Sequence, residues 1–167
     1  MLYRSPWWLP EGHSQTILAA RWASKPAMQY HRVRWTTPDH DFIDLDFTES
    51  PEVAARHHSL WVLFHGLEGC SRSHYSLAVM NQARAAGALG VVVHFRGCSG
   101  ENNLNPRAYH SGDSTEMDWI LRRLRESFPA VDSMHVTGVS LGGNVLLKWL
   151  GEQQEAAREV ISSAVSV

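Results

Sequence analysis

The chain has 167 residues, a formal net charge of −2 and 44% hydrophobic residues. Its length is typical of one domain, and its composition supplies a hydrophobic core, which argues against intrinsic disorder. Because basic and acidic residues nearly balance, the chain lacks the excess of basic residues that is typical of a nucleic-acid-binding domain. No apolar run reaches the ~18 residues of a membrane span. Cys70 and Cys98 are too few for a disulfide scaffold, and the N-terminus lacks the apolar stretch of a signal peptide, so we expect a cytoplasmic protein.

Residues 1–30 are rich in tryptophan and proline, and we expect them to form an N-terminal arm packed on the domain. A short helix is predicted within this arm from about Ser14 to Trp22. Packing against the sheet is the default role for Trp7, Trp8 and Trp22. The alternatives are a wall for an acyl chain and a contact with a membrane surface.

Residues 31–167 carry the strands and helices of the expected domain. Apolar and polar residues alternate over 31–36 and 42–47, which predicts two half-buried strands, and Pro38-Asp39-His40 supplies the turn of an antiparallel hairpin. Nearly continuous apolar runs indicate parallel strands that are covered on both faces. These and the later strands are predicted over 60–64, 91–95, 134–139 and 160–167. Helices are predicted over 74–86, from about 113, and over 141–150.

The alternation of strands and helices predicts an α/β fold with a parallel sheet and right-handed crossovers. Asp113 and Glu116 have the spacing of a capping box at the start of the second of these helices. The last predicted strand reaches Val167, so we expect an incomplete domain. Its exposed sheet edge over 160–167 predicts aggregation or pairing with a missing half.

Ser140 is the strongest candidate for a catalytic residue. It is the central residue of Gly138-Val139-Ser140-Leu141-Gly142, which matches G-x-S-x-G, and it stands between a predicted strand and a predicted helix. This is the context of a nucleophile elbow, in which the serine occupies a strained turn. The flanking Gly138 and Gly142 let the two backbones close beside it. The alternative is a glycine-rich turn with a bystander serine.

The segment His65-Gly66-Leu67-Glu68-Gly69 follows the strand predicted over 60–64. Acyl transfer passes through a tetrahedral oxyanion, which needs preorganised N–H donors. In the elbow fold one donor is the residue after the serine, here Leu141, and the other lies in the loop after the third strand, here Leu67. Gly66 lets that loop approach closely. The alternative is a simple strand-to-helix turn.

For four other polar residues we favour structural roles over functional ones. Arg96, in a glycine-rich segment after the strand predicted over 91–95, is expected to hold a loop through backbone carbonyls rather than to bind an anionic group. Cys70 lacks the elbow that a thiol nucleophile would need. Asp113 is expected to be a helix N-cap, and Asp118 to lie within the same helix, so neither is favoured as a triad acid.

Ten histidines are present, and three of them fall at or near the expected catalytic edge: His65, His94 and His110. We expect His65 to fix a loop through its ring N–H rather than to act as a general base, since geometry decides that role. The histidines show no metal-ligand spacing, so no metal site is predicted.

Longer strings resemble one branch of a known superfamily. They are residues 10–17 (PEGHSQTI), 41–46 (DFIDLD), 65–69 (HGLEG), 71–75 (SRSHY), 95–101 (FRGCSGE), 109–113 (YHSGD) and 138–148 (GVSLGGNVLLK). Together they resemble the YheT-like hydrolases, bacterial relatives of the animal α/β-hydrolase-domain lipases and esterases. The resemblance runs over essentially the whole chain.

This resemblance implies the N-terminal portion of an α/β-hydrolase fold, through the elbow and the sixth strand. It also implies a serine carboxylesterase or lipase-like enzyme with a Ser–His–Asp triad, no cofactor, and a small-molecule or lipid ester as substrate. Ser140 matches the nucleophile, and Leu67 and Leu141 match the oxyanion donors. The acid and the histidine follow the serine in this fold, so both are expected beyond Val167. Two alternatives stay open: an acyltransferase, and a truncated, non-catalytic binding module.

Overall fold

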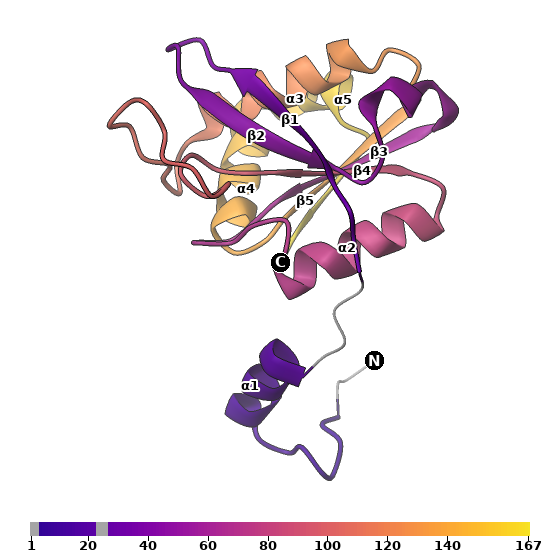
Figure 1. The fold of residues 1–167 in the computed structure, drawn as a ribbon, viewed down its shortest axis with the longest axis vertical. Helices are drawn as coiled ribbons and strands as arrows, with labels where there is room; N and C mark the ends of the chain where they lie inside the picture. Colours follow the sequence, from indigo (N-terminus) through magenta and orange to yellow (C-terminus); the bar gives the residue numbers. More distant parts are fainter. Residues whose placement is uncertain (1–3, 23–26) are drawn as a thin grey trace.

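The computed structural model describes residues 4–22 and 27–167. Within these residues one six-stranded sheet has the order β1-β2-β4-β3-β5-β6 (Figure 1). The strands are β1 (His31–Thr36), β2 (Phe42–Phe47), β3 (Ser59–Phe64), β4 (Leu89–Val93), β5 (Ser133–Gly138) and β6 (Ser163–Ser166). The α-helices are α1 (Gly12–Trp22), α2 (His74–Ala85), α3 (Ser114–Ser127), α4 (Leu141–Gln153) and α5 (Ala157–Val160), with 3-10 turns at Pro51–Arg56 and Gln154–Ala156.

The sheet is mixed at one side and parallel at the other. β1 pairs with β2 and β2 pairs with β4 in antiparallel fashion, whereas β4, β3, β5 and β6 are parallel neighbours. The predicted hairpin and the predicted parallel strands are therefore both confirmed. In a parallel sheet the carboxyl ends of the strands share one edge, where ligands bind in open α/β sheets. The loops after β3, β4 and β5 meet at this edge.

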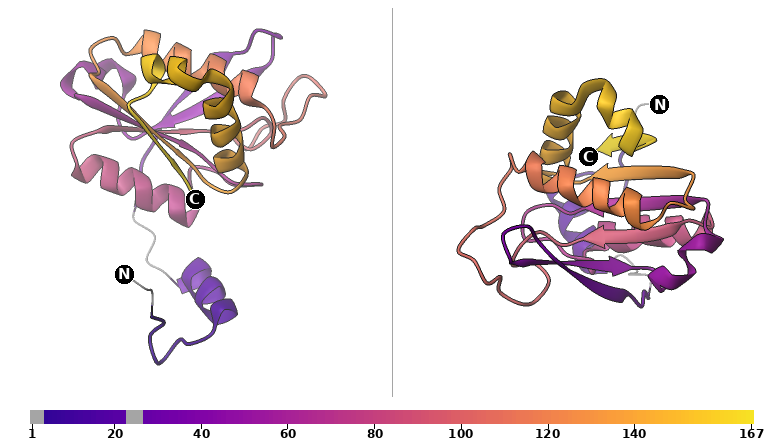
Figure 2. Two further views of the ribbon diagram at one scale, coloured as in Figure 1. Left: turned by 180° about the vertical axis from the view of Figure 1, so that it is seen from behind. Right: turned by 90° about the horizontal axis from the view of Figure 1, so that it is seen from above.

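Helices cover both faces of the sheet. Figures 1 and 2 show α2 on one face and α3, α4 and α5 on the other. The larger core cluster lies under α3 and α4 and includes the fully buried Trp149 and Leu121. A smaller cluster under α2 contains Leu63, Met80 and Val92. This two-sided cover explains the almost uninterrupted apolar runs of β3 and β4.

β2 is not the half-buried strand that its alternation predicted, because all six of its residues are buried. Asp44 and Asp46 point to one face, and each accepts a paired hydrogen bond from an arginine of β1. Arg34 binds Asp44 at 2.8 Å, and Arg32 binds Asp46 at 2.7 Å. Buried carboxylates are tolerated when they are paired in this way. The alternation in the sequence thus marks buried carboxylates that are covered by partly exposed arginines, whose side chains are 42% and 41% exposed.

The strand predicted over 160–167 is only partly a strand. Val160 ends α5, the N–H of Ile161 donates to the Ala157 carbonyl at 2.9 Å, and β6 begins at Ser163. Val160 is 5% exposed and packs into the core from the helix, so its apolar character did not require a strand. β6 is the last strand in the described sheet order, and Val165 on it is 53% exposed.

The predicted capping box at α3 is wrong. Asp113 does precede the helix, but its side chain does not cap it and instead accepts two hydrogen bonds of 2.7 Å from Arg107. Glu116 accepts hydrogen bonds from the buried Arg96 rather than reaching back to the helix start. Longer-range guanidinium pairs have therefore replaced the local capping contacts at both positions.

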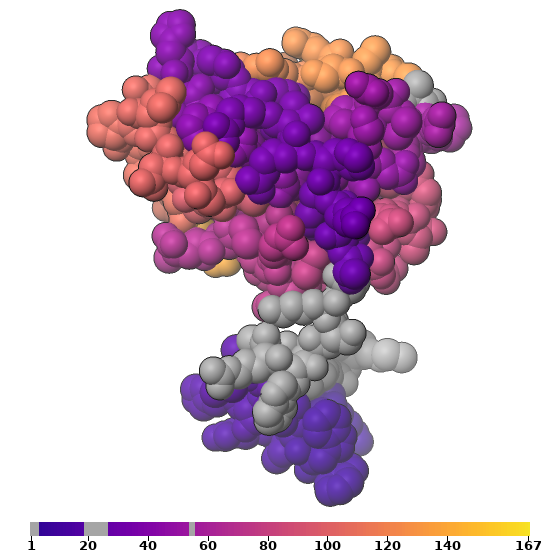
Figure 3. All heavy atoms as spheres, viewed as in Figure 1, coloured from indigo at the N-terminus to yellow at the C-terminus, as the bar shows by residue number. Residues whose placement is uncertain are grey.

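The N-terminal arm packs on the domain only in part, as far as its described residues show. At its end Met28 is 7% exposed and belongs to the smaller core cluster under α2, and Tyr30 packs against that cluster. Figure 3 shows the earlier part of the arm, coloured indigo, as a lobe of its own below the sheet domain.

Trp7 is 89% exposed and Trp8 is 64% exposed, and both lie in a tight turn in which the Leu9 N–H donates to the Pro6 carbonyl at 2.9 Å. The Trp22 side chain lies outside the described residues. Within the described ranges, no helix is long and apolar enough to cross a membrane.

Candidate active site

Ser140 stands between β5 and α4 in a strained backbone conformation. Its φ is 51° and its ψ is −110°, a combination that costs free energy for any residue with a Cβ and is retained mainly at functional sites. The side chain is exposed at the carboxyl edge of the sheet. The turn leads directly into the helix, since the N–H of Asn144 donates to the Ser140 carbonyl at 2.9 Å. The strand, turn and helix expected around this serine are present.

The two glycines that flank Ser140 are required by close backbone approaches. A Cβ on Gly138 would lie 2.5 Å from the Gly142 carbonyl oxygen, and a Cβ on Gly142 would lie 2.7 Å from the His65 carbonyl oxygen. Both distances are far below van der Waals contact, and the atoms that would clash belong to the backbone. The packing of α4 against β5 and the end of β3 therefore depends on the absence of these side chains.

The glycine loop, residues 65–69 after β3, lies against the same serine. A Cβ on Gly66 would be only 3.3 Å from the Ser140 Cβ. The loop turns back on itself, because the Gly69 N–H donates to the Gly66 carbonyl at 2.9 Å, and Glu68 has a φ of 55°. The structure thus brings together the two segments that the sequence analysis singled out.

Among the backbone N–H groups at this junction that have no acceptor in the described residues, two are the expected oxyanion donors. They belong to Leu67 in the glycine loop and to Leu141 at the first position of α4. Leu141 has no acceptor because the first amides of a helix have no partner within it, and the helix macrodipole places partial positive charge there. Free, fixed N–H groups next to an exposed serine hydroxyl are suited to binding an oxyanion.

His65 has both ring nitrogens engaged. Its Nδ1–H donates to the Gly66 carbonyl at 2.7 Å, and its Nε2 accepts the Phe95 N–H at 3.1 Å. The side chain is fully buried, and this burial, with the nearby His94, lowers the pKa of His65 to about 4. His65 is therefore neutral and fixes the loop through its ring N–H, as the sequence analysis predicted.

His94 is also engaged within the protein. Its Nε2 lies 2.9 Å from Asp46, and its Nδ1 lies 3.2 Å from the Cys98 carbonyl oxygen. Burial of Asp46 opposes its ionisation, but hydrogen bonds from Arg32, His94 and Ser71 hold the pKa of Asp46 well below its usual range. This cluster stabilises the base of the loops at the carboxyl edge.

His110 is exposed, and its Nδ1 accepts the Gly112 N–H at 3.1 Å. None of the three histidines at this edge hydrogen-bonds to the Ser140 hydroxyl, nor does any other side chain in the part of the chain that the structure describes.

The remaining candidates have structural contacts. Arg96 does hold a loop, but through carboxylates rather than the expected backbone carbonyls, because its buried guanidinium binds Asp39, Asp41 and Glu116. Asp118 accepts hydrogen bonds from Arg122 and from Trp149 Nε1. Cys70 and Cys98 are both free thiols.

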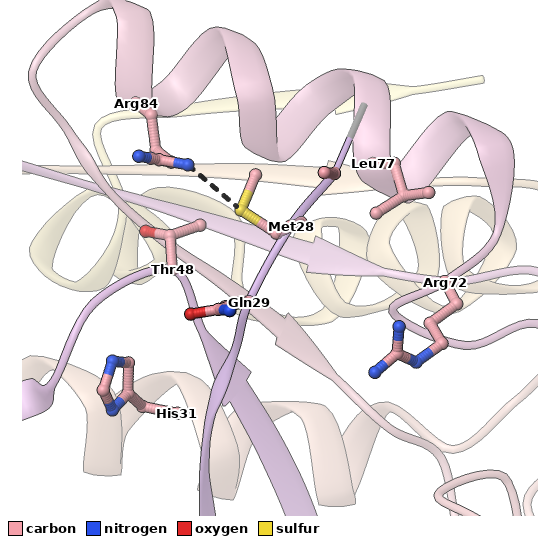
Figure 4. Close-up of a pocket in the computed structure, with 8 residues that line it drawn as sticks. Met28, Gln29, His31, Thr48, Arg72, Leu77 and Arg84 are labelled. Atoms are coloured by element: carbon pink, nitrogen blue, oxygen red, sulfur yellow. Dashed lines mark hydrogen bonds between the residues drawn. The ribbon is translucent and has the colours of Figure 1, made fainter. Parts of the chain in front are cut away.

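A cavity of about 750 Å³ lies on the α2 side of the sheet (Figure 4). Its described walls come from α2, from the segment that leads into β1, and from single residues of neighbouring loops, with Arg72, Arg84 and His31 among them. None of these described lining residues belongs to the elbow or to the glycine loop. The cavity is therefore separate from Ser140 and the glycine loop.

Comparison with known proteins identifies the relatives of the chain. No family model matches it. It is 41% identical to the provisionally named esterase YheT of Escherichia coli (strain K12) over 141 residues, which cover 84% of this chain and 41% of that protein. It is 31% identical to Phospholipase ABHD3 of Homo sapiens over 149 residues, 87% of this chain and 36% of that protein. The chain is a relative of the YheT-like α/β-hydrolases. It spans about two fifths of the length of these curated relatives.

Solved structures show the same fold. The chain superposes on the Pyrococcus furiosus esterase Pf2001 with a TM-score of 0.61 at 17% identity, over 82% of this chain and 50% of that one. An α/β serine hydrolase homologue from Coxiella burnetii gives a TM-score of 0.62 at 14% identity, over 84% of this chain and 64% of that one. The α/β-hydrolase fold that the sequence strings implied is confirmed.

Sequence reasoning missed two residues of this site. Tyr75 and Tyr109 lie within strings that carry the family resemblance, yet no local pattern marks a tyrosine as the acceptor for a distant loop amide. In the structure the Tyr75 hydroxyl accepts the Gly66 N–H, and the Tyr109 hydroxyl accepts the Glu68 N–H.

Proposed function

We propose that this chain carries the nucleophile and the oxyanion donors of a serine hydrolase that cleaves carboxylic esters. The observation that carries the proposal is the exposed Ser140 at φ 51°, with the glycine loop against it. The relatives support ester cleavage, since their names include esterase, phospholipase and, at 29% identity, the Monoacylglycerol lipase of Saccharomyces cerevisiae.

The chemistry follows from these groups. Ser140 Oγ forms a bond to the acyl carbon of the ester, and its proton passes to a general base. The negative oxygen of the tetrahedral intermediate accepts hydrogen bonds from the N–H groups of Leu67 and Leu141. Removal of one such donor typically costs about 3 to 4 kcal/mol of transition-state stabilisation. Collapse of the intermediate expels the alcohol, which takes the proton, and water then releases the acid and regenerates the serine.

We place the general base and its carboxylate partner in a segment outside this chain. Both ring nitrogens of His65 and of His94 are engaged within the protein. In this fold the acid and the histidine follow the nucleophile in the sequence, and the curated relatives are longer than this chain. A complementary C-terminal half would supply both groups.

A fluorophosphonate probe tests the proposal when imidazole is added as an external base. We expect Ser140 to be labelled in the folded chain, at a rate that rises with imidazole concentration, and peptide mass spectrometry to place the label on this residue. Ser140→Ala should remove the labelling. Ser111→Ala, which alters another exposed serine at the same edge, should label like the wild type.

Two results would contradict the proposal. One is a chain that is folded by circular dichroism but stays unlabelled at high imidazole concentration. The other is labelling that persists in Ser140→Ala.

A further inference from the structure

The amides of the glycine loop differ in what they bind. The Gly66 N–H donates to the Tyr75 hydroxyl at 3.1 Å, and the Glu68 N–H donates to the Tyr109 hydroxyl at 3.0 Å. Between them, the Leu67 N–H has no acceptor in the part of the protein that the structure describes. The two tyrosines therefore accept hydrogen bonds from the amides on either side of the Leu67 amide.

The direction of the Leu67 N–H follows from its own peptide group. This peptide also contains the Gly66 carbonyl, which accepts hydrogen bonds from the Gly69 N–H at 2.9 Å and from His65 Nδ1 at 2.7 Å. In a trans peptide the N–H points opposite to the carbonyl. Fixing the Gly66 carbonyl on one side therefore directs the Leu67 N–H to the other.

Tyr75 reaches the loop from the first turn of α2. Its hydroxyl lies so close to Gly69 that a Cβ there would overlap it, and it is 3.7 Å from the position of a Cβ on Gly66. A Cβ on Gly66 would in turn lie 3.3 Å from the Cβ of Ser140. A glycine is thus needed at 69 to leave room for the Tyr75 hydroxyl. In space, only Gly66 lies between this hydroxyl and Ser140.

Tyr109 reaches the loop from the long segment between β4 and α3. Its ring stacks on Phe95 at 5.2 Å with an interplanar angle of 8°. Its hydroxyl is hydrogen-bonded to the Cys98 thiol as well as to the Glu68 N–H, and burial raises the pKa of Tyr109. The stacked ring and the hydrogen bond hold the phenol as an acceptor for the loop amide.

We propose that Tyr75 and Tyr109 are positioning residues that hold the glycine loop so that the Leu67 N–H faces the oxyanion formed at Ser140. This inference rests on the proposed function, because it assigns the tyrosines to the same reaction. Neither tyrosine touches the reacting atoms. Each acts through a loop amide.

The test uses Tyr75→Phe and Tyr109→Phe, which remove only the hydroxyl groups. Tyr30→Phe is the matched control, because the Tyr30 hydroxyl donates to the Ser71 carbonyl at 3.0 Å and not to the glycine loop. Amide hydrogen exchange measured by NMR reports on the loop without any reaction. Fluorophosphonate labelling with imidazole then gives a maximal rate and a half-saturating probe concentration.

We expect exchange at Gly66 to accelerate in Tyr75→Phe and exchange at Glu68 to accelerate in Tyr109→Phe, each by about 5-fold to 10-fold for one lost hydrogen bond. The maximal labelling rate should fall about 10-fold in each variant, less than the 10²-fold to 10³-fold cost of deleting a donor. The half-saturating concentration should stay unchanged, and Tyr30→Phe should leave both rates as in the wild type.

Unchanged exchange at both amides would overturn the positioning role, whatever the labelling rate. Accelerated exchange with an unchanged labelling rate would also overturn it, because the loop would then move without affecting the reaction. An equal fall of the labelling rate in Tyr30→Phe would also overturn the positioning role, because the loss of a hydroxyl that does not bind the loop would then slow labelling just as much. A wild type that is never labelled would contradict the proposed function, while accelerated exchange in the two variants would still show that the tyrosines hold the loop.

Discussion

The elbow and the glycine loop meet at Ser140, yet they are held in different ways. The elbow is fixed by backbone against backbone, since a Cβ on Gly138 or Gly142 would collide with carbonyl groups. The glycine loop is fixed by side chains, namely the hydroxyls of Tyr75 and Tyr109 and the ring of His65.

This difference teaches what each region tolerates. Where two backbones are closely packed, an added methyl group must push the whole elements apart, because protein interiors have no free space to hold it. A loop held by a few hydrogen bonds can lose one of them and still fold. Damage to the elbow should therefore appear as lost stability, and loss of a hydroxyl that holds the loop as lost reactivity.

The largest effect is expected from Gly142→Ala. The new Cβ would lie 2.7 Å from the His65 carbonyl oxygen, so α4 must move away from β3, at a cost of about 3 kcal/mol in the free energy of unfolding. Gly151→Ala is the matched control in the same helix, because a Cβ there meets nothing within 4 Å. Replacing that glycine should stabilise the chain by about 0.5 to 1 kcal/mol. Urea unfolding measures both, and equal stability of the two variants would contradict the account of the elbow.

A comparable effect on stability is expected from pH, through His65 in the glycine loop. The pKa of His65 is about 4 in the folded chain, whereas an unperturbed histidine has a pKa of about 6.5. Between these two pH values the unfolded chain binds the proton and the folded chain does not. The stability from this group is complete above pH 6.5 and is lost as the pH falls towards 4, by about 3 kcal/mol in total.

Urea unfolding between pH 4.5 and 7.5 measures this slope. His65→Gln should flatten it, whereas His110→Gln, which changes an exposed histidine, should leave it unchanged. An identical slope in the wild type and in His65→Gln would show that the loop is not held by a neutral imidazole.

The smallest effect on stability is expected from Gly66→Ala, where the two regions touch. A Cβ there lies 3.3 Å from the Ser140 Cβ and 3.5 Å from the Val139 carbonyl oxygen, so a shift of a few tenths of an ångström admits it. We expect a change in stability below about 1 kcal/mol and a several-fold slower labelling of Ser140. Gly12→Ala, in open space on the arm, should change neither. A stability loss as large as that of Gly142→Ala would contradict the distinction between the two regions.

The sequence was sufficient to predict the strand, the turn and the helix around Ser140, because the constraints on this segment are local. G-x-S-x-G between a strand and a helix specifies one backbone arrangement, and the strained φ of Ser140 agrees with it. β2 shows where local patterns fail. Its aspartates indicated a solvent-facing side, but the partly exposed Arg32 and Arg34 of β1 cover and neutralise them. These ion pairs can be recognised only from the register in which β1 and β2 pair.

The tyrosines that hold the glycine loop could not be found from the sequence. Tyr75 is 9 positions from the amide that it accepts, and Tyr109 is 41 positions from its own. Contacts of this kind depend on where α2 and the segment before α3 come to lie, which propensity and periodicity do not determine. The same reason explains why Arg96 was assigned to backbone carbonyls when its partners are three carboxylates.

A crystal structure of the phosphonylated chain would test the central claim most directly. The adduct places a tetrahedral phosphorus on the attacking oxygen and a phosphoryl oxygen where the oxyanion would form. We predict a bond to Ser140 Oγ and a phosphoryl oxygen at about 2.7 to 3.1 Å from the backbone nitrogens of both Leu67 and Leu141. An adduct on another residue, or a phosphoryl oxygen that turns away from these two N–H groups, would contradict the assignment of the site.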